Sequence, residues 1–311
     1  MTRAYRESAC AVNATDGLSN DAIISCVMPP RTYLDQNAVI ELGRMARAPV
    51  FRKKLDTALE SGSLNVVVAS WHLIETARTS SLANAEELAN FIDSLNPSWL
   101  FERRNIQKLD IEDDFYKFLK IEHPSSSRVT TRSAVFAELN HQNDEPKFDI
   151  PSAVFVKQWV QHPEQLKVLE ETYKTNADTL IRLRELVKSG KITNEIRSRV
   201  NEILVKLSLP KTTPAGLVVG HDTTVNYVQQ VKAETIPSFA IETAISEHEW
   251  VSQGGADGNT LIDKFHLISA LPYVDEIVSR DKFFHKVYPA AVKTGHVRAN
   301  LLDNHEFFKR F

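Results

Sequence analysis

The sequence predicts an α/β fold with a central, mostly parallel sheet and a mainly helical insertion. Two observations lead to this prediction. Short segments rich in β-branched residues, each followed by a helical apolar pattern, recur near both ends of the chain. A long middle part lacks this alternation. The chain of 311 residues has room for one large domain or two modest ones. We therefore expect a lead-in at 1–30, an α/β domain at 31–122 and 237–311, and the insertion at 123–236.

Two strand-helix units begin the expected α/β domain. Residues 31–41 indicate a short strand that ends in Asp35, followed by a helix that begins near Asn37. Residues 64–79 indicate a buried strand, then Ser70 as a helix N-cap and Glu75 in the second turn.

The segments after these units continue the alternation. Residues 39–61 suggest two helices separated at Pro49. Residues 99–101 suggest a third strand, which 106–110 would continue or pair with.

The C-terminal part repeats the pattern. Apolar residues at helical spacing predict a helix over 259–271, with Asp263 on its polar face. Pro272 ends that helix. Residues 273–279 then indicate a strand with Asp281 just beyond its end, and 297–302 indicate a last strand.

The middle of the chain reads as helical. We expect helices at 153–160, 163–186 and 193–207, and a crossover of this length exceeds what a compact α/β unit requires. The insertion would pack over the acidic edge of the sheet and select the substrate, restrict access or mediate formation of a homo-oligomer.

Four acids thus fall at or just after strand ends, on one edge of the expected sheet. Carboxylates held close together repel one another unless a cation lies among them. A site made of oxygen ligands, without Cys, suits Mg²⁺ or Mn²⁺. The four are Asp35, Glu75, Asp263 and Asp281.

The order of these features resembles the PIN domain family of metal-dependent nucleases. The motifs are strand-Asp-x-Asn-helix, strand-Ser-x(4)-Glu, Asp on a helix, and strand-Ser/Thr-Arg-Asp. The matching residues are Asp35 and Asn37, Ser70 and Glu75, Asp263, and Ser279, Arg280 and Asp281. Gln36 departs from the small hydroxyl residue that is frequent in the family.

This resemblance implies a three-layer PIN-like fold in which the four acids form the catalytic and metal-binding quartet. It also implies endonucleolytic hydrolysis of RNA by a water bound to Mg²⁺ or Mn²⁺. A toxin or defence role would follow in a microbe, with an inhibitor protein as partner. The neighbours Asn37, Ser70, Ser279 and Arg280 would then contact substrate or support the ligands.

Two histidines lie one helical turn from an acid: His72 before Glu75, and His266 after Asp263. Either could contact substrate or orient a metal ligand, or simply pack in the core. The His221-Asp222 pair could also indicate a phosphohydrolase, but the further metal ligands that such a site needs cannot be assembled.

Composition limits the function classes. The net charge of -3 argues against a protein that binds nucleic acid through a general excess of basic residues. Basic residues do cluster at 44–54 and 182–206, as either phosphate contacts or solvated helix faces. Two cysteines without metal-ligand spacing, and no long apolar run, predict a cytoplasmic protein without a membrane span.

Two alternatives stay open from the residues. A structure-specific or single-strand DNA nuclease could use the same acids. A non-catalytic binding or scaffold module could retain the fold. A phosphatase of the haloacid dehalogenase type fits poorly, because it would need a second acid where this chain has Asn37.

Overall fold

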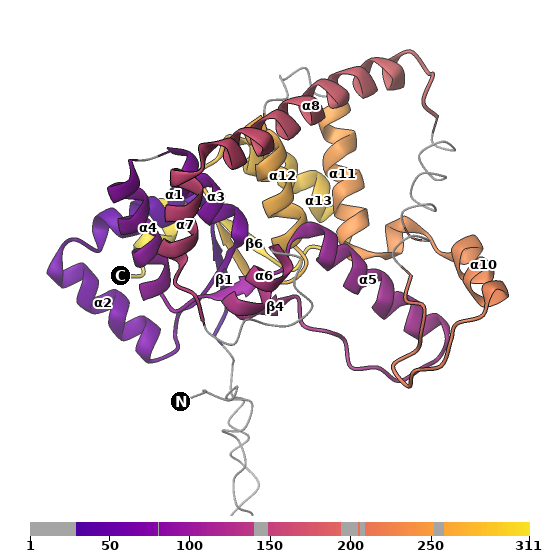
Figure 1. Cartoon of the computed structure of the whole chain (residues 1–311), viewed down its shortest axis with the longest axis horizontal. Coiled ribbons are helices and arrows are strands. Elements are labelled where there is room, and N and C mark those ends of the chain that lie inside the picture. The colour runs from indigo at the N-terminus through magenta and orange to yellow at the C-terminus, as the bar shows by residue number, and fades with distance from the viewer. Residues whose placement is uncertain (1–28, 80, 140–148, 194–204, 206–208, 252–257) are drawn as a thin grey trace, which may run out of the picture.

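The fold is built on a six-stranded sheet with strand order β4-β3-β2-β1-β5-β6 (Figure 1). The computed structural model describes residues 29–311 apart from 80, 140–148, 194–204, 206–208 and 252–257. All neighbouring strands are parallel except β4, which pairs antiparallel with β3 at the edge. The strands are β1 (Arg31–Leu34), β2 (Asn65–Ala69), β3 (Ser98–Leu100), β4 (Val129–Thr130), β5 (Glu276–Val278) and β6 (Asn300–Leu302).

Helices connect these strands and extend beyond the sheet. In the first part of the chain they are α1 (Gln36–Met45), α2 (Pro49–Glu60), α3 (Ser70–Thr79), α4 (Leu82–Ser94), α5 (Arg103–Phe118), α6 (Arg132–Leu139) and α7 (Ser152–Gln161). In the second part they are α8 (Pro163–Lys188), α10 (His221–Gln230), the short 3-10 helix η1 (Ala233–Thr235), α11 (Pro237–Val251), α12 (Gly258–Ala270), α13 (Lys282–Val292) and α14 (Asn304–Phe308). None of the helices described is long and apolar enough to cross a lipid bilayer.

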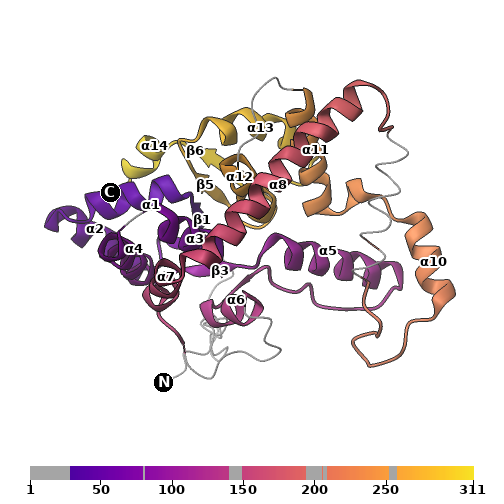
Figure 2. The same ribbon diagram turned by 45° about the horizontal axis from the view of Figure 1, so that its top comes forward.

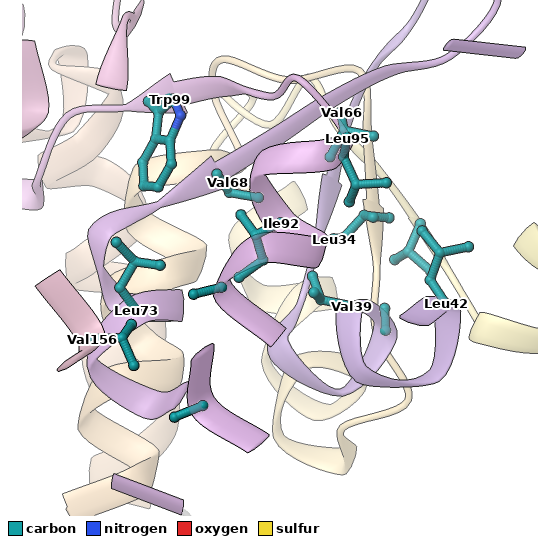
Figure 3. Packing of buried hydrophobic residues seen from close by; sticks show 14 of the residues in the cluster. Leu34, Val39, Leu42, Val66, Val68, Leu73, Ile92, Leu95, Trp99 and Val156 are labelled. Atoms are coloured by element: carbon teal, nitrogen blue, oxygen red, sulfur yellow. The ribbon is translucent and has the colours of Figure 1, made fainter. Parts of the chain in front are cut away.

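The strand residues alternate between two buried clusters, one on each face of the sheet. On one face, Leu34, Val68 and Val278 pack with α1, α4 and α7 (Figure 3). Residues such as Ile92 of α4 and Val156 of α7 complete this cluster. Every second residue of a strand points to the same side, so a short strand buried on both faces must be apolar throughout.

The opposite face of the sheet is covered by α11, α12 and α13. Tyr33 and Ile277 point to this side, where they meet Ile262 and Ile268 of α12. Tyr33, the neighbour of Leu34 in β1, therefore faces α12 rather than α1. Both faces of the mostly parallel sheet thus carry helices, as the sequence predicted for an α/β fold.

The expected insertion is not separate from the rest of the molecule. β4 lies within 123–236 yet joins the sheet, and α7 packs on α3 and α4. The long helix α8 then passes from α7 over α12 to α11 (Figure 2). A third buried cluster joins Ile111 and Phe115 of α5 with Tyr227 of α10. The range 123–236, expected as a mainly helical insertion, thus also contributes the short edge strand β4 to the sheet.

Two predicted elements differ in the structure. Residues 106–110, expected to extend or pair with the third strand, belong to the long helix α5. The strand expected at 273–279 is confined to β5, because Tyr273 and Val274 form a turn with backbone bonds to Ala270. The predicted break at Pro49 is confirmed, since Pro49 is the first residue of α2. Most of the helix expected at 193–207 and nearly all of the lead-in at 1–30 lie outside the described residues.

Candidate acidic site at the carboxyl edge of the sheet

The carboxyl ends of β1 and β5 meet at the point where the strand order reverses. From β1 the chain adds β2 and β3 on one side, whereas β5 and β6 lie on the other. In open α/β sheets, ligands bind in the crevice beyond the strand ends at such a switch point. Asp35 directly follows β1, and Ser279 directly follows β5. The four acids expected from the sequence are best described from this point outward.

Asp35 is almost fully buried, with 3% of its surface exposed. It is the N-cap of α1, and its Oδ1 accepts a hydrogen bond of 2.7 Å from the backbone of Gln36. No Lys or Arg side chain is within ion-pair distance of it among the residues that the structure describes. Burial raises the pKa of Asp35, and the nearby charge of Glu75 raises it too, while His266 and two hydrogen bonds lower it.

Ser279 joins Asp35 to the segment that carries Asp281. Its Oγ donates to Oδ2 of Asp35 over 2.9 Å and accepts from the backbone N–H of Asp281 over 3.0 Å. Asp281 itself is the N-cap of α13, where its Oδ1 accepts from Phe283 over 2.6 Å. One buried hydroxyl therefore fixes the distance between the ends of β1 and β5.

Glu75 lies on α3 and faces α12. Its Oε2 lies 3.3 Å from Nε2 of His266, which is fully buried. Burial opposes ionisation of Glu75, but the hydrogen bond and charge of His266 outweigh it, so the pKa of Glu75 is lowered. Nδ1 of the same histidine is hydrogen-bonded to the hydroxyl of Tyr33.

Asp263 lies on α12, three residues before His266 and therefore on the same side of the helix. Burial raises the pKa of Tyr33 well above its ordinary value, and the charges of Asp35, Glu75 and Asp263 raise it further. Three of the four predicted acids, from three distant parts of the chain, thus act on one buried hydroxyl. Asp281 is connected to them through Ser279.

The remaining predicted neighbours have structural partners. Asn37 is the second residue of α1 rather than the start of the helix, because Asp35 caps it. Ser70 begins α3, and its hydroxyl donates to Glu102 over 3.1 Å. Arg280 is exposed and lies 3.6 Å from Glu41 on α1. His72 is a packing histidine, since its Nε2 bonds to the carbonyl of Leu34 over 2.6 Å.

Gln36, the departure from the family pattern, points inward. It is buried, and its amide donates to Thr76 of α3 over 2.9 Å. Its side chain thereby fastens the start of α1 to the helix that carries Glu75.

The first basic cluster does not border the acids. Arg44 lies near the far end of α1, about 13 Å along the helix axis from Asp35 at about 1.5 Å per residue. Arg47 and Arg52 pair with Glu87 and Asp56. These side chains line a surface cavity of about 720 Å³ between α1, α2 and α4. Arg47 and Arg52 thus have acidic partners beside this cavity, and contact of the cluster with phosphate stays a prediction.

Sequence reasoning missed three residues of this region. The sequence pattern indicates only that Tyr33 is a core residue of a strand. Glu102 follows β3 and is the N-cap of α5, and Asp303 follows β6 and is the N-cap of α14. The signal for Asp303 was available, as an acid directly after a short apolar run. Glu102 was hidden because residues 106–110, in the first part of α5, were expected to form a strand.

The donor chemistry of the site fits a hard dication, although the predicted quartet does not form one cluster. Among the described residues, no three His, Cys, Asp or Glu side chains are arranged to hold a metal ion. Mg²⁺ commonly takes only one or two carboxylates and completes its octahedron with water. Asp35, which is buried, and Glu75, whose charge raises the pKa of Asp35, would supply two such oxygen donors. The fit is therefore to a water-rich site centred on Asp35 and Glu75.

Comparison of the chain with protein-family models, with curated proteins and with solved structures found no match.

Proposed function

We propose that the protein is a metal-dependent endonuclease that hydrolyses phosphodiester bonds, with RNA as its substrate and Mg²⁺ or Mn²⁺ as its cofactor. One observation carries this proposal. Asp35 is a buried carboxylate without a Lys or Arg side chain paired to it in the described structure, at the switch point of the sheet, and the charges of His266 and Glu75 both act on it. A fold that holds two anions together at the usual position of a ligand site requires a counter-ion there.

The side chains have distinct tasks under this proposal. Asp35 and Glu75 would hold the cation, while Asp263 and Asp281 would bind water molecules of its shell. Ser279 would keep the carboxylate of Asp35 oriented through its 2.9 Å hydrogen bond. A bound Mg²⁺ or Mn²⁺ would lower the pKa of a water molecule and neutralise charge on the phosphate. The exposed guanidinium of Arg280 is the nearest basic group after β5 that could contact a neighbouring phosphate.

The test is a cleavage assay on single-stranded RNA, structured RNA, single-stranded DNA and flap DNA with Mg²⁺ or Mn²⁺. We expect Asp35→Asn and Asp281→Asn to lower the rate by about 100-fold or more, as for other groups that act electrostatically in a transition state. Asp303→Asn is the matched control, because Asp303 also follows a strand and caps a helix but is exposed.

Each outcome of this assay has a defined meaning. Chelation of the metal should abolish cleavage by the wild type. Equal rates for wild type and both aspartate variants would contradict the proposal, because the activity would then come from another site. Faster cleavage of DNA than of RNA would support the alternative DNA nuclease. Binding of nucleic acid without cleavage would support the non-catalytic module.

A further inference from the structure

Tyr33, His266 and Glu75 form a continuous line from the interior of the sheet to its carboxyl edge. The hydroxyl of Tyr33 contacts Nδ1 of His266, and Nε2 of His266 lies 3.3 Å from Oε2 of Glu75. Tyr33 and His266 both have 0% of their surface exposed. They come from β1 and α12, whereas Glu75 is on α3.

The direction of the protons in this line follows from the chemistry of its members. A phenol keeps its proton at neutral pH, so the hydroxyl of Tyr33 donates to Nδ1 of His266. Nδ1 is then an acceptor, and the ring proton of His266 is on Nε2, facing the carboxylate. A histidine whose second nitrogen is fixed by a hydrogen bond has its tautomer and ring orientation fixed as well.

His72 provides an internal comparison. Its ring lies 5.2 Å from that of His266, centroid to centroid, and it is equally buried. Its two nitrogens, however, bond to the backbone, at the carbonyl of Leu34 and the N–H of Ala69. His72 therefore holds the ends of β1 and β2 together. The two ring nitrogens of His266 instead face side chains: Nδ1 faces the hydroxyl of Tyr33, and Nε2 faces the carboxylate of Glu75, an acid of the candidate site.

We propose that Tyr33 and His266 are positioning residues that fix the carboxylate of Glu75 as a metal ligand. This inference rests on the proposed function, because it assigns Glu75 to the metal. His266 holds one oxygen of Glu75, and Tyr33 holds His266 in the orientation that this contact requires. Nε2 of His266 and Oε2 of Glu75 are close enough for an ion pair but do not have the geometry of a hydrogen bond, and such contacts often tighten only when a site binds its ligands.

The test measures binding of Mn²⁺ alone to the full chain by calorimetry. We expect His266→Phe to weaken binding by about 10- to 100-fold, the usual effect of removing a group that orients a metal ligand. His266→Gln should bind more tightly than His266→Phe, because its amide N–H can replace that of Nε2. Tyr33→Phe removes a single oxygen from the core and should weaken binding by a smaller factor. His72→Gln is the control and should leave Mn²⁺ affinity unchanged.

The outcomes separate this inference from the function on which it rests. If the wild type binds no Mn²⁺, the proposed function fails and the positioning role fails with it. If the wild type binds Mn²⁺ and folded Tyr33→Phe and His266→Phe bind as tightly, only the positioning role is wrong. Circular dichroism without metal identifies a variant that has lost its fold. Tyr33→Phe decides the question if the substitutions of His266 prevent folding.

Discussion

At the scale of single residues, Asp35 links stability to function. Its pKa is raised in the folded protein by burial and by Glu75. The folded state therefore holds the Asp35 proton more tightly than the unfolded state does. The stability that this provides is present below the unfolded pKa and is lost as pH rises through the folded pKa. At neutral pH, burial of the ionised side chain therefore destabilises the protein.

We therefore predict that Asp35→Asn stabilises the metal-free protein at pH 7 by on the order of 1 kcal/mol. Asparagine can still accept from Gln36 and contact Ser279 without burying a charge. Added Mg²⁺ should raise the melting temperature of the wild type but not of the variant, since only the wild type has both carboxylates. Thermal unfolding with and without Mg²⁺ measures both effects. A variant less stable than the wild type in the absence of metal would show that burial of the Asp35 charge is not costly.

His72 makes the opposite contribution to acid stability. Burial lowers its pKa from the ordinary 6.5 to about 4, because the ring is enclosed and His266 is nearby. As the pH falls from 6.5 towards 4, His72 is protonated in the unfolded chain before it is protonated in the folded protein. The free energy of unfolding therefore decreases over this pH range. At about 1.4 kcal/mol per pKa unit, the loss attributable to His72 is about 3 kcal/mol.

We predict that His72→Gln is less stable than the wild type at pH 7 but loses less stability between pH 6.5 and pH 4.5. Urea unfolding at several pH values measures this slope. Replacement of the exposed His162 by Gln is the control and should reproduce the slope of the wild type. An unchanged slope in His72→Gln would mean that other groups cause the acid sensitivity.

The sequence predicted the positions of Asp35 and Asp281, because an acid directly after a short apolar strand has a fixed place in an α/β sheet. It could not predict their partners. The line from Tyr33 to Glu75 joins residues far apart in the chain, and single-sequence patterns carry no information on such contacts. For the same reason, the sequence predicted that four acids share one edge of the sheet but could not predict whether they form one metal-binding cluster. Among the described residues they do not.

At the scale of secondary structure, α5 illustrates where pattern reading fails. Ile106 and Ile111 are both buried, but Asp110 between them is buried too. A buried acid interrupts the apolar period and makes a helix resemble a short strand with a loop. Asp110 is tolerated because Arg128 pairs with it at 2.7 Å and the backbone of Ser238 donates to it at 3.1 Å. Tyr273 also donates to this carboxylate from the turn before β5.

This buried pair ties α5 to the segment before β4 and to α11. We predict that Arg128→Ala lowers the free energy of unfolding by about 3 to 5 kcal/mol, because Asp110 would remain as a buried charge without its cation. Arg47→Ala is the control, since Arg47 and its partner Glu87 are both exposed. Urea denaturation measures both losses. Similar losses for the two variants would show that burial of the pair is unimportant.

At the scale of the whole molecule, the third cluster joins the middle of the chain to the α/β unit. Tyr227 of α10 is 1% exposed, and its ring lies 4.9 Å from that of Phe115 on α5. Its hydroxyl donates to Asp114 over 2.8 Å. The sequence predicted a mainly helical insertion at 123–236 because this range lacks α/β alternation. Its pattern could not show that apolar residues such as Tyr227 pack against α5.

We predict that Tyr227→Ala lowers the free energy of unfolding by about 3 to 5 kcal/mol, as for other buried aromatic residues. Tyr227→Phe is the matched variant and should lose only about 1 kcal/mol, the value of one hydrogen bond. In urea, both variants should unfold in a single transition with its midpoint at a lower urea concentration than in the wild type. Circular dichroism and tryptophan fluorescence should give the same midpoint. Fluorescence is measured in a background in which Trp71, Trp159 and Trp250 are replaced by Phe, so that it reports on Trp99 in β3, far from α10 in the sequence. If the middle of the chain unfolded independently, Tyr227→Ala would separate the two signals and leave the Trp99 transition at its original urea concentration.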